Sequence, residues 1–253
     1  MKKIALIGCG TIGKEIALAF ENKVINGELA ALYDVNHEKA QELKEILKTN
    51  SPVITREMKQ AVSIADFIIE TASQKAVLEI SKYAFSRKKD IFILSVGSLV
   101  TYPDIFKRAK QHNRRIYFPS GAVAGLDAVR GAKLSSIKSA VLTTRKPPAA
   151  LGLKLKKEKV IFNGRAKDAI AKFPANINVA AALSIAGIGP EKTKVMIIAD
   201  PKVKRNTHEI EVISSSGRIF TRTENVPSPG NPKTSYLASL SAISCLKEIL
   251  QSE

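Results

Sequence analysis

Short apolar runs alternate with helical segments through the first half of the chain. The apolar runs cover residues 3–8, 29–34, 66–70, 91–95 and 115–118, and the helical segments between them cover 11–21, 37–48, 73–85 and 101–111. Strand and helix follow each other with short connections, and right-handed crossovers are the usual way to join parallel strands. The pattern therefore predicts the α/β class, with a doubly wound parallel sheet of the Rossmann type in the N-terminal half.

The pattern changes after residue 119, where the strand-like runs become longer and richer in β-branched residues. These runs cover 139–144, 193–198, 208–214 and 218–223, and SSSG at 214–217 has the composition of a hairpin turn. Two helical segments, 166–173 and 176–186, interrupt them. We predict a C-terminal α+β domain with a mixed sheet and helices on one face.

The C-terminal stretch predicts a linker followed by a helix. VPSPGNP at 226–232 has the composition of a rigid linker, and residues 234–250 are amphipathic. Apolar residues recur at helical spacing, at Leu237, Leu240, Ile243, Leu246, Ile249 and Leu250. We expect this helix to return to the first domain, so the predicted domains are 1–119 with 231–253, and 120–230.

Composition places the chain among ordinary globular proteins. It has 253 residues, of which 45% are hydrophobic and 25% charged, enough to bury a core without disulfides or metals. Cys9 and Cys245 show no CxxC spacing, so we predict neither a disulfide framework nor a metal site. The apolar run from Ile4 to Ile7 is too short for a signal peptide, and no run is long enough to span a bilayer. We expect a soluble cytoplasmic protein with no membrane partner.

The charge is strongly positive and unevenly distributed. The formal net charge is +17, and residues 130–172 hold twelve basic against two acidic residues, which accounts for ten of these charges. Such a field attracts polyanions or speeds the encounter with a small dianionic substrate, and the alternative is a solvated lysine-rich surface. Phe162 is the one aromatic residue in this stretch. Because bases stack on aromatic side chains, a nucleic-acid partner is not expected.

The sequence GCGTIG connects the first predicted strand to the first helix. Gly8 permits a tight turn, Gly10 lets the backbone approach a pyrophosphate and Gly13 lets the helix pack on the strand. Asp34 follows 21 positions after the last glycine, at the end of the second strand, where its carboxylate would bind ribose hydroxyls and oppose a 2′-phosphate. The first domain is therefore predicted to bind a dinucleotide, NAD in preference to NADP.

Further cofactor contacts are predicted from the same topology. The first helical turn and the loops after the fourth and fifth strands border a dinucleotide in such sheets. The cofactor candidates from this reasoning are Gly8, Gly10, Thr11, Ile12, Gly13, Asp34, Ala72, Ser73 and Gly97.

Three histidines offer a proton acceptor for chemistry near neutral pH. His37 and His112 lie in polar helix ends and are expected on the surface. His208 stands at the head of the strand HEIEVIS, after the loop PKVKRN, from which it could reach a cofactor. Imidazole is a natural base for an alcohol or ammonium group that loses hydride, and the alternative is a surface histidine at a strand edge.

Several long motifs resemble the L-aspartate dehydrogenase family. They are GCGTIG, SVGSL at 95–99, PSGAVAGLDAV at 119–129, TTRKPP at 143–148, FPANINVAAALSIAG at 173–187, NTHEIEV at 206–212 and PSPGNPKTSYLASLSAI at 227–243. The resemblance runs nearly end to end. Thr11 and Ala124 depart from it, standing where the family often has alanine and glycine respectively.

The resemblance implies NAD(P)-dependent oxidation of L-aspartate to iminoaspartate, a precursor of quinolinate and NAD. It also implies a second domain similar to that of dihydrodipicolinate reductase, serving substrate binding, catalysis and dimerisation, and a homodimer. The family's active-site histidine falls on His208, and two positions of its nucleotide pocket fall on Ala122 and Asn178. In this mechanism His208 takes a proton from the substrate ammonium.

Two substrate carboxylates then need partners. Ser120, Asn206 and Thr207 are candidate hydrogen-bond donors, and Arg145 or Lys146 is the candidate cation, unless both belong to the solvated basic surface. Two rival functions stay open at this point. A reductase of the dihydrodipicolinate type would carry paired histidines, and no HH occurs here. The other rival is a nucleic-acid-binding protein with a nucleotide-sensing domain.

Overall fold

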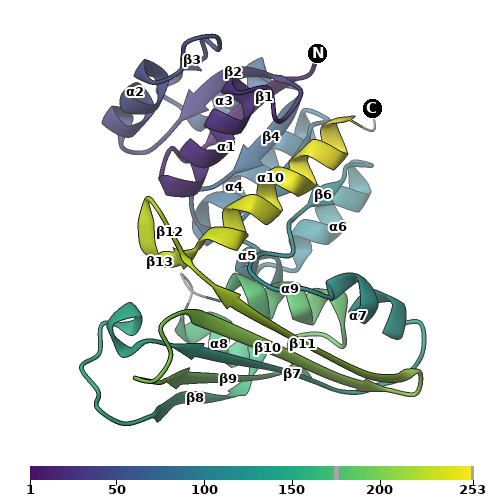
Figure 1. Cartoon of the computed structure of the whole chain (residues 1–253). Coiled ribbons are helices and arrows are strands. Elements are labelled where there is room, and N and C mark those ends of the chain that lie inside the picture. Colours follow the sequence, from purple (N-terminus) through teal and green to yellow (C-terminus); the bar gives the residue numbers. More distant parts are fainter. Residues whose placement is uncertain (174–176, 252–253) are drawn as a thin grey trace. The chain divides into compact units, whose positions relative to one another are not determined.

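The computed structural model describes residues 1–173 and 177–251, except for the side chains of 231–233. The chain forms two compact units, one made of Met1–Pro119 and the chain from Ala242 onward, and one made of Ser120–Ser241 (Figure 1). Unit 1 is a doubly wound parallel sheet and unit 2 carries a mixed sheet. The predicted fold class is confirmed.

Unit 1 is built on a six-stranded parallel sheet in the order β3-β2-β1-β4-β5-β6. The strands are β1 (Lys3–Ile7), β2 (Glu28–Tyr33), β3 (Val53–Ile54), β4 (Phe67–Glu70), β5 (Asp90–Ile93) and β6 (Ile116–Tyr117). Strands buried on both faces of a parallel sheet read as continuous apolar runs. All four residues of β4 are buried, which explains why the sequence pattern found the central strands.

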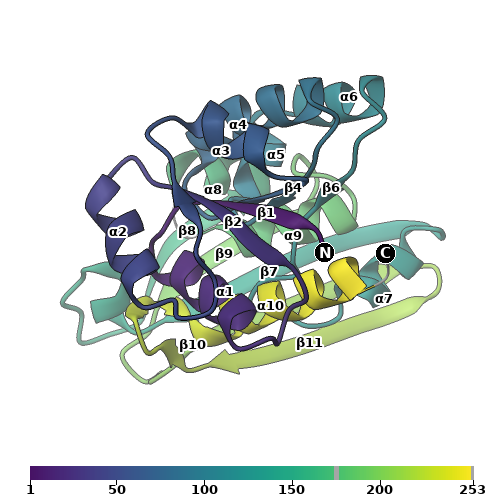
Figure 2. The same cartoon turned by 90° about the horizontal axis from the view of Figure 1, so that it is seen from above.

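Helices cover both faces of this sheet (Figure 2). They are α1 (Thr11–Glu21), α2 (His37–Glu45), α3 (Met58–Ile64), α4 (Gln74–Ser86), α5 (Gly97–Thr101), α6 (Asp104–Gln111) and the C-terminal α10 (Tyr236–Gln251). Ala242 and Leu246 of α10 are fully buried in the same apolar cluster as Ile16 and Phe20 of α1 and Leu6 of β1. The C-terminal helix thus completes the core of unit 1, as predicted.

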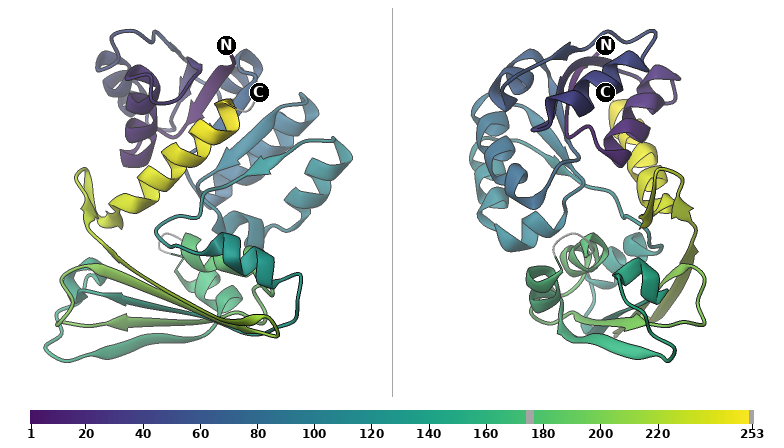
Figure 3. Two further views of the ribbon diagram at one scale, coloured as in Figure 1. Left: turned by 45° about the vertical axis from the view of Figure 1, so that its right-hand side comes forward. Right: turned by 90° about the vertical axis from the view of Figure 1, so that its left-hand side faces the viewer.

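Unit 2 contains a five-stranded mixed sheet in the order β11-β10-β7-β9-β8. Its strands are β7 (Ile137–Lys146), β8 (Lys159–Arg165), β9 (Lys194–Ala199), β10 (Asn206–Ser214) and β11 (Gly217–Asn225). The β7–β9 pair is parallel and the other pairs are antiparallel. Helices α7 (Leu126–Ala132), α8 (Ala166–Lys172) and α9 (Asn178–Ala186) lie over one face (Figure 3), and a short 3₁₀ turn, Pro148–Leu151, follows β7.

Side chains along β7 and β10 alternate between a buried and a half-exposed face. Leu142 of β7 and Ile210 of β10 are opposite each other and fully buried, so they mark the face that the helices cover. A strand places every second side chain on the same face. Thr144, Lys146 and His208 therefore share the buried face.

Some sequence predictions need correction. The stretch 226–232 is not a plain linker, because β12 (Pro227–Ser228) and β13 (Asn231–Ser235) pair as an antiparallel ribbon. The segment 101–111 is not one helix, since Pro103 separates α5 from α6. Residue 176, the predicted start of α9, lies outside the described residues. Among the helices that the structure describes, none combines the length and apolar character of a membrane span.

Candidate active site

The glycine turn between β1 and α1 leaves no room for larger residues at two positions. Gly8 has φ of +104°, and a Cβ there would lie 2.6 Å from the carbonyl carbon of Thr71. A Cβ on Gly13 would collide with the carbonyl oxygen of Gly8. Around Gly10 nothing lies within 4 Å of such an atom. The turn is thus packed against other protein atoms at Gly8 and Gly13, and at Gly10 it is open to a ligand.

A groove of about 660 Å³ opens beside this turn, at the carboxyl ends of β1, β2 and β4. Its lining comprises Ile7, Gly8, Gly10, Tyr33, Asp34, Val35, Lys39, Met58, Thr71, Ala72, Ser73, Lys75, Ala76 and Glu79. Thr11 and Ile12 form the first turn of α1 and are half-buried. A helix N-terminus offers unpaired N–H groups to an anion. The residues present therefore fit the pyrophosphate and ribose of a dinucleotide.

Asp34 holds the loop around it through both carboxylate oxygens. Oδ2 accepts a hydrogen bond from the Cys9 N–H at 2.7 Å, and Oδ1 accepts from the Asn36 N–H at 2.8 Å. Burial and the charge of Asp34 raise the pKa of the Cys9 thiol to about 12, so Cys9 is inert. Each carboxylate oxygen keeps lone pairs for a ribose hydroxyl. Lys39 lines the same groove and supplies a cation near Asp34.

Glu70, at the end of β4, ties together the loops that follow β4 and β5. Its Oε1 accepts from the Ala72 N–H at 2.8 Å and from the Ser95 hydroxyl at 2.8 Å, and its Oε2 accepts from the Ser95 N–H at 3.0 Å. The carboxyl group is fully buried, and burial raises its pKa to about 6. The hydrogen bonds lower the pKa, but their effect is smaller than that of burial. Gly97 opens the next helix and is buried.

His208 lies on β10 directly opposite Thr144 of β7. Its Nδ1 is 2.9 Å from the Thr144 Oγ1, and the residue is 6% exposed. Burial and then the nearby charge of Lys146 lower the pKa of His208 to about 3. The imidazole is therefore neutral at pH 7. When Nδ1 donates its proton to Thr144, Nε2 keeps a lone pair for a ligand proton.

Ala122 is held against the strand that neighbours His208. Its carbonyl oxygen accepts hydrogen bonds from the Thr223 hydroxyl at 2.8 Å and from the Asn225 amide at 3.1 Å. Thr223 is the β11 residue paired with His208. The segment that carries Ala122 is thus fixed to the same sheet as the imidazole.

Asn178 opens α9 beside the same segment. A Cβ on Gly121 would lie 3.7 Å from the Val179 side chain, which places the start of α9 next to the turn before Ala122. The three positions that the family resemblance selects, Ala122, Asn178 and His208, therefore lie on neighbouring segments of unit 2.

Arg145 and Lys146, adjacent in sequence, face opposite sides of the sheet. Arg145 pairs with Glu158 at 2.7 Å and with Asp200 at 3.3 Å. Lys146 shares the buried face with His208 and is 6% exposed. The structure thus separates the two candidate cations and leaves Lys146 beside the imidazole.

The three candidate hydrogen-bond donors are also placed differently. Asn206 shares the His208 face, is buried, and its amide donates to the Ser235 hydroxyl at 3.5 Å. Thr207 faces the Arg145 side, and its hydroxyl donates to the Arg205 carbonyl at 3.4 Å. Ser120 is half-buried at the start of unit 2.

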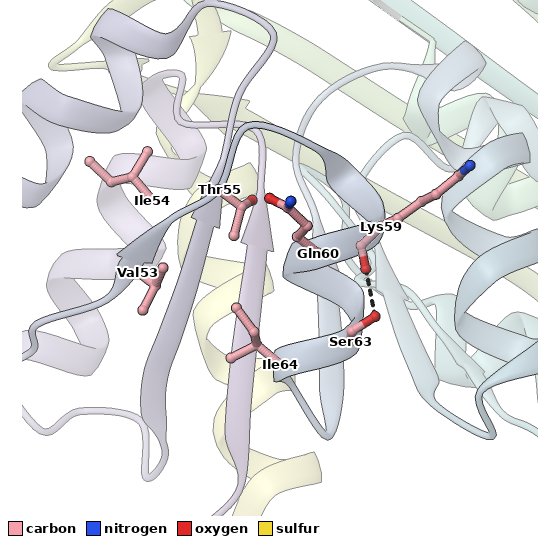
Figure 4. A pocket seen from close by; sticks show the side chains of 7 residues that line it. All are labelled: Val53, Ile54, Thr55, Lys59, Gln60, Ser63 and Ile64. Atoms are coloured by element: carbon pink, nitrogen blue, oxygen red, sulfur yellow. Dashed lines mark hydrogen bonds between the residues drawn. The ribbon is translucent and has the colours of Figure 1, made fainter.

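A second hollow, of about 450 Å³, lies beside β3 and α3 (Figure 4). Its lining is mostly apolar and includes Val53, Ile54 and Ile64. The Lys59 ammonium lies 4.8 Å from the centre of the Tyr83 ring, and the Ser63 hydroxyl donates to the Lys59 carbonyl at 2.8 Å. Lys59 is the charged residue of this lining, and its ammonium lies over the Tyr83 ring. Within the described residues, no three His, Cys, Asp or Glu side chains cluster as metal ligands would.

The glycine turn and its groove, with a buried imidazole on a separate mixed sheet, define a class: the dinucleotide-binding dehydrogenases of two units. Known families match both units, "Homoserine dehydrogenase, NAD binding domain" at residues 8–119 and "Aspartate dehydrogenase, C-terminal" at 127–249. The chain belongs to the L-aspartate dehydrogenase family.

Individual relatives agree with this assignment. The L-aspartate dehydrogenase of Methanosarcina barkeri is 49% identical, with 99% of this chain and 97% of the relative covered. That of Nitrosopumilus maritimus is 38% identical, with 98% and 96% covered. The crystal structure of aspartate dehydrogenase from Thermotoga maritima superposes with a TM-score of 0.78 at 29% identity, covering 100% of this chain and 96% of that one. The resemblance predicted from sequence is confirmed.

Sequence reasoning missed several residues of these sites. Glu70 could have been found from the sequence, since it is an acidic residue that ends an otherwise apolar strand. Thr144 and Asn225 could not have been found in this way, because their hydrogen-bond partners lie far away in sequence and meet them only through strand pairing.

Proposed function

We propose that this protein catalyses the NAD(P)-dependent oxidation of L-aspartate to iminoaspartate. The observation that carries the proposal is the buried, neutral imidazole of His208, oriented by Thr144 at 2.9 Å. The rival reductase lacks support, because the relatives that match nearly the whole chain are L-aspartate dehydrogenases. The product would supply quinolinate and hence NAD synthesis.

The proposed cofactor site is the groove of unit 1 with its glycine turn. The first turn of α1 would hold the pyrophosphate, and Asp34 the adenosine ribose. The proposed cofactor residues are Gly8, Gly10, Thr11, Ile12, Gly13, Asp34, Ala72, Ser73, Gly97, Ala122 and Asn178. The nicotinamide, when bound, supplies the acceptor for hydride from the substrate Cα. NAD is the proposed cofactor, with NADP as a second, since Lys39 and Lys75 also line the groove.

His208 is the proposed general base. Its Nε2 would take a proton from the substrate ammonium, which frees the nitrogen lone pair to form the imine as hydride leaves Cα. Asn206 shares the His208 face and is a proposed donor to the substrate, with Ser120 and Thr207 as the further candidates. This chemistry needs no metal ion.

The remaining proposals concern the whole protein. We assign dinucleotide binding to residues 1–119 with 231–253, and substrate binding and dimerisation to 120–230. A homodimer is supported by the half-exposed face of the unit 2 sheet, where Ile213 and Phe220 are 41% and 54% exposed. We place the protein in the cytoplasm, without a membrane or nucleic-acid partner. Part of the basic stretch is neutralised locally, since Arg165 and Lys167 both pair with Glu191.

The function is tested by following reduced nicotinamide in a substrate panel. The protein is incubated with NAD and L-aspartate, D-aspartate, L-glutamate or L-malate, and we expect turnover with L-aspartate. His208→Ala should lower kcat by roughly 10²- to 10⁴-fold with the KM for NAD unchanged. His112→Ala, at an exposed helix end, is the matched control. Activity on malate alone would overturn the amine chemistry, and full turnover by the His208 variant would overturn the assignment of the base.

A further inference from the structure

The Lys146 side chain is a buried cation without an acidic partner. It is 6% exposed, and among the side chains that the structure describes none forms a hydrogen bond or ion pair with its ammonium. Burial alone lowers its pKa. The Lys146 Nζ is not among the fully buried atoms that lack a hydrogen-bond partner, so the ammonium at the end of this buried side chain is open to an anion that approaches from solvent.

Asp200 is hydrogen-bonded to the Lys146 backbone, but its carboxylate has other partners. The Asp200 N–H donates to the Lys146 carbonyl at 2.9 Å, so the two residues are neighbours through the backbone. The Asp200 carboxylate, however, pairs with Arg145 at 3.3 Å and accepts from the Lys202 N–H at 2.8 Å. These contacts hold the Asp200 carboxylate on Arg145, and within the described residues no ion pair joins it to the Lys146 ammonium.

The position of this cation fits the substrate of the reaction. Lys146 lies two residues beyond Thr144 on the same face of β7, and Thr144 is directly opposite His208. Such diagonal neighbours lie about 7–8 Å apart, so a lysine and an imidazole at these positions can bind one small molecule. An amino acid whose ammonium faces His208 would thus present a carboxylate to Lys146.

We propose that Lys146 binds a carboxylate of the substrate and thereby sets the preference for an acidic amino acid, an inference that rests on the proposed function. Arg145 is excluded from this role because it faces the other side of the sheet. Binding of a carboxylate to Lys146 also changes the basicity of His208. Lys146 contributes to the low pKa of His208, so a carboxylate that neutralises it makes the imidazole a stronger base when substrate is present.

The test compares Lys146→Met with Lys146→Arg and with Lys138→Met, an exposed lysine on the same strand. We expect Lys146→Met to lower kcat/KM for L-aspartate by at least about 30-fold, because a buried charge pair loses one partner. The KM for NAD should not change, Lys146→Arg should lose less, and Lys138→Met should match the wild type. An effect of Lys146→Met below about twofold would overturn the proposal.

Two further readouts exclude a merely structural role. In Lys146→Met the acid limb of kcat/KM should move to higher pH, because the cation that lowers the pKa of His208 is gone. L-asparagine tests the selectivity: a collapsed preference for aspartate over asparagine in Lys146→Met supports binding of the side-chain carboxylate, and a parallel loss on both substrates would overturn the role of Lys146 in selecting an acidic amino acid.

Succinate separates failure of this inference from failure of the proposed function. This unreactive dicarboxylate should raise the thermal midpoint of the wild-type protein with NAD present and leave that of Lys146→Met unchanged. If the wild type does not oxidise aspartate, the function fails while succinate still tests the site. Equal protection of both proteins by succinate would overturn the role of Lys146.

Discussion

Glu70→Gln is predicted to flatten the pH dependence of stability between pH 4 and pH 7. The carboxyl group is fully buried and its pKa is raised from 4.5 to about 6. A raised pKa means that the folded protein favours the protonated form. Its contribution to stability is therefore fully present below pH 4.5 and is lost as the pH rises through about 6.

The size of the effect follows from the same values. A rise in pKa from 4.5 to about 6 corresponds to on the order of 2 kcal/mol between the two ends of this pH range. Glutamine does not titrate, so the difference in the free energy of unfolding between wild type and variant should change by about 2 kcal/mol from one end of this pH range to the other. The variant also loses an acceptor for the Ser95 N–H, worth about 1–3 kcal/mol, but this loss is nearly constant with pH.

Thermal unfolding of both proteins from pH 4 to pH 7.5 measures the difference. A change of 2 kcal/mol corresponds to roughly 4–8 °C in the difference between their midpoints. Glu79→Gln, an exposed glutamate of the same unit, serves as the control and should follow the wild-type curve. Parallel curves for wild type and Glu70→Gln across the whole range would refute the reasoning.

Three other changes have distinct expected outcomes. Thr144→Val removes the hydroxyl that holds His208 and should lower kcat by roughly 10- to 100-fold, with recovery in Thr144→Ser; an unchanged kcat would show that the hydrogen bond is dispensable. Gly13→Ala should lower the thermal midpoint because of the collision with Gly8, whereas Gly10→Ala should keep the midpoint and lose NAD affinity, both read by thermal shift with and without NAD. Asp34→Asn removes a negative charge worth about 1–4 kcal/mol against a 2′-phosphate, so the ratio of kcat/KM for NADP to that for NAD should rise at least about fivefold; an unchanged ratio would remove Asp34 as the discriminating residue.

The sequence was informative wherever burial repeats regularly. Apart from Lys3 and Glu70 at their ends, β1 and β4 are apolar because helices cover both faces of the sheet, and the last helix has a clear apolar stripe. It was least informative at the edges. The outer strand β8 (Lys159–Arg165) has a basic residue at each end, a short apolar run and mostly exposed side chains, and β3 is two residues long, so neither shows the long apolar run of a central strand.

The candidate site was predictable in its residue types and less so in its geometry. TTRKPP contains two adjacent cations, and which one faces His208 depends on the phase of β7, fixed by Leu142 and its buried neighbours. Thr144 meets His208 across 64 positions of sequence, and Asn225 meets Ala122 across 103. Contacts of this kind come from strand register, which no local motif encodes.

The division of unit 1 between the two ends of the chain affects how the protein folds during synthesis. Residues 1–119 emerge from the ribosome first, but the apolar layer that includes Ile16 and Phe20 is closed only by Ala242 and Leu246. Unit 2 is contiguous and needs no residue beyond Ser241. The nucleotide-binding half, although translated first, must therefore wait for the final helix before it is complete, with part of its apolar surface exposed to chaperones until then.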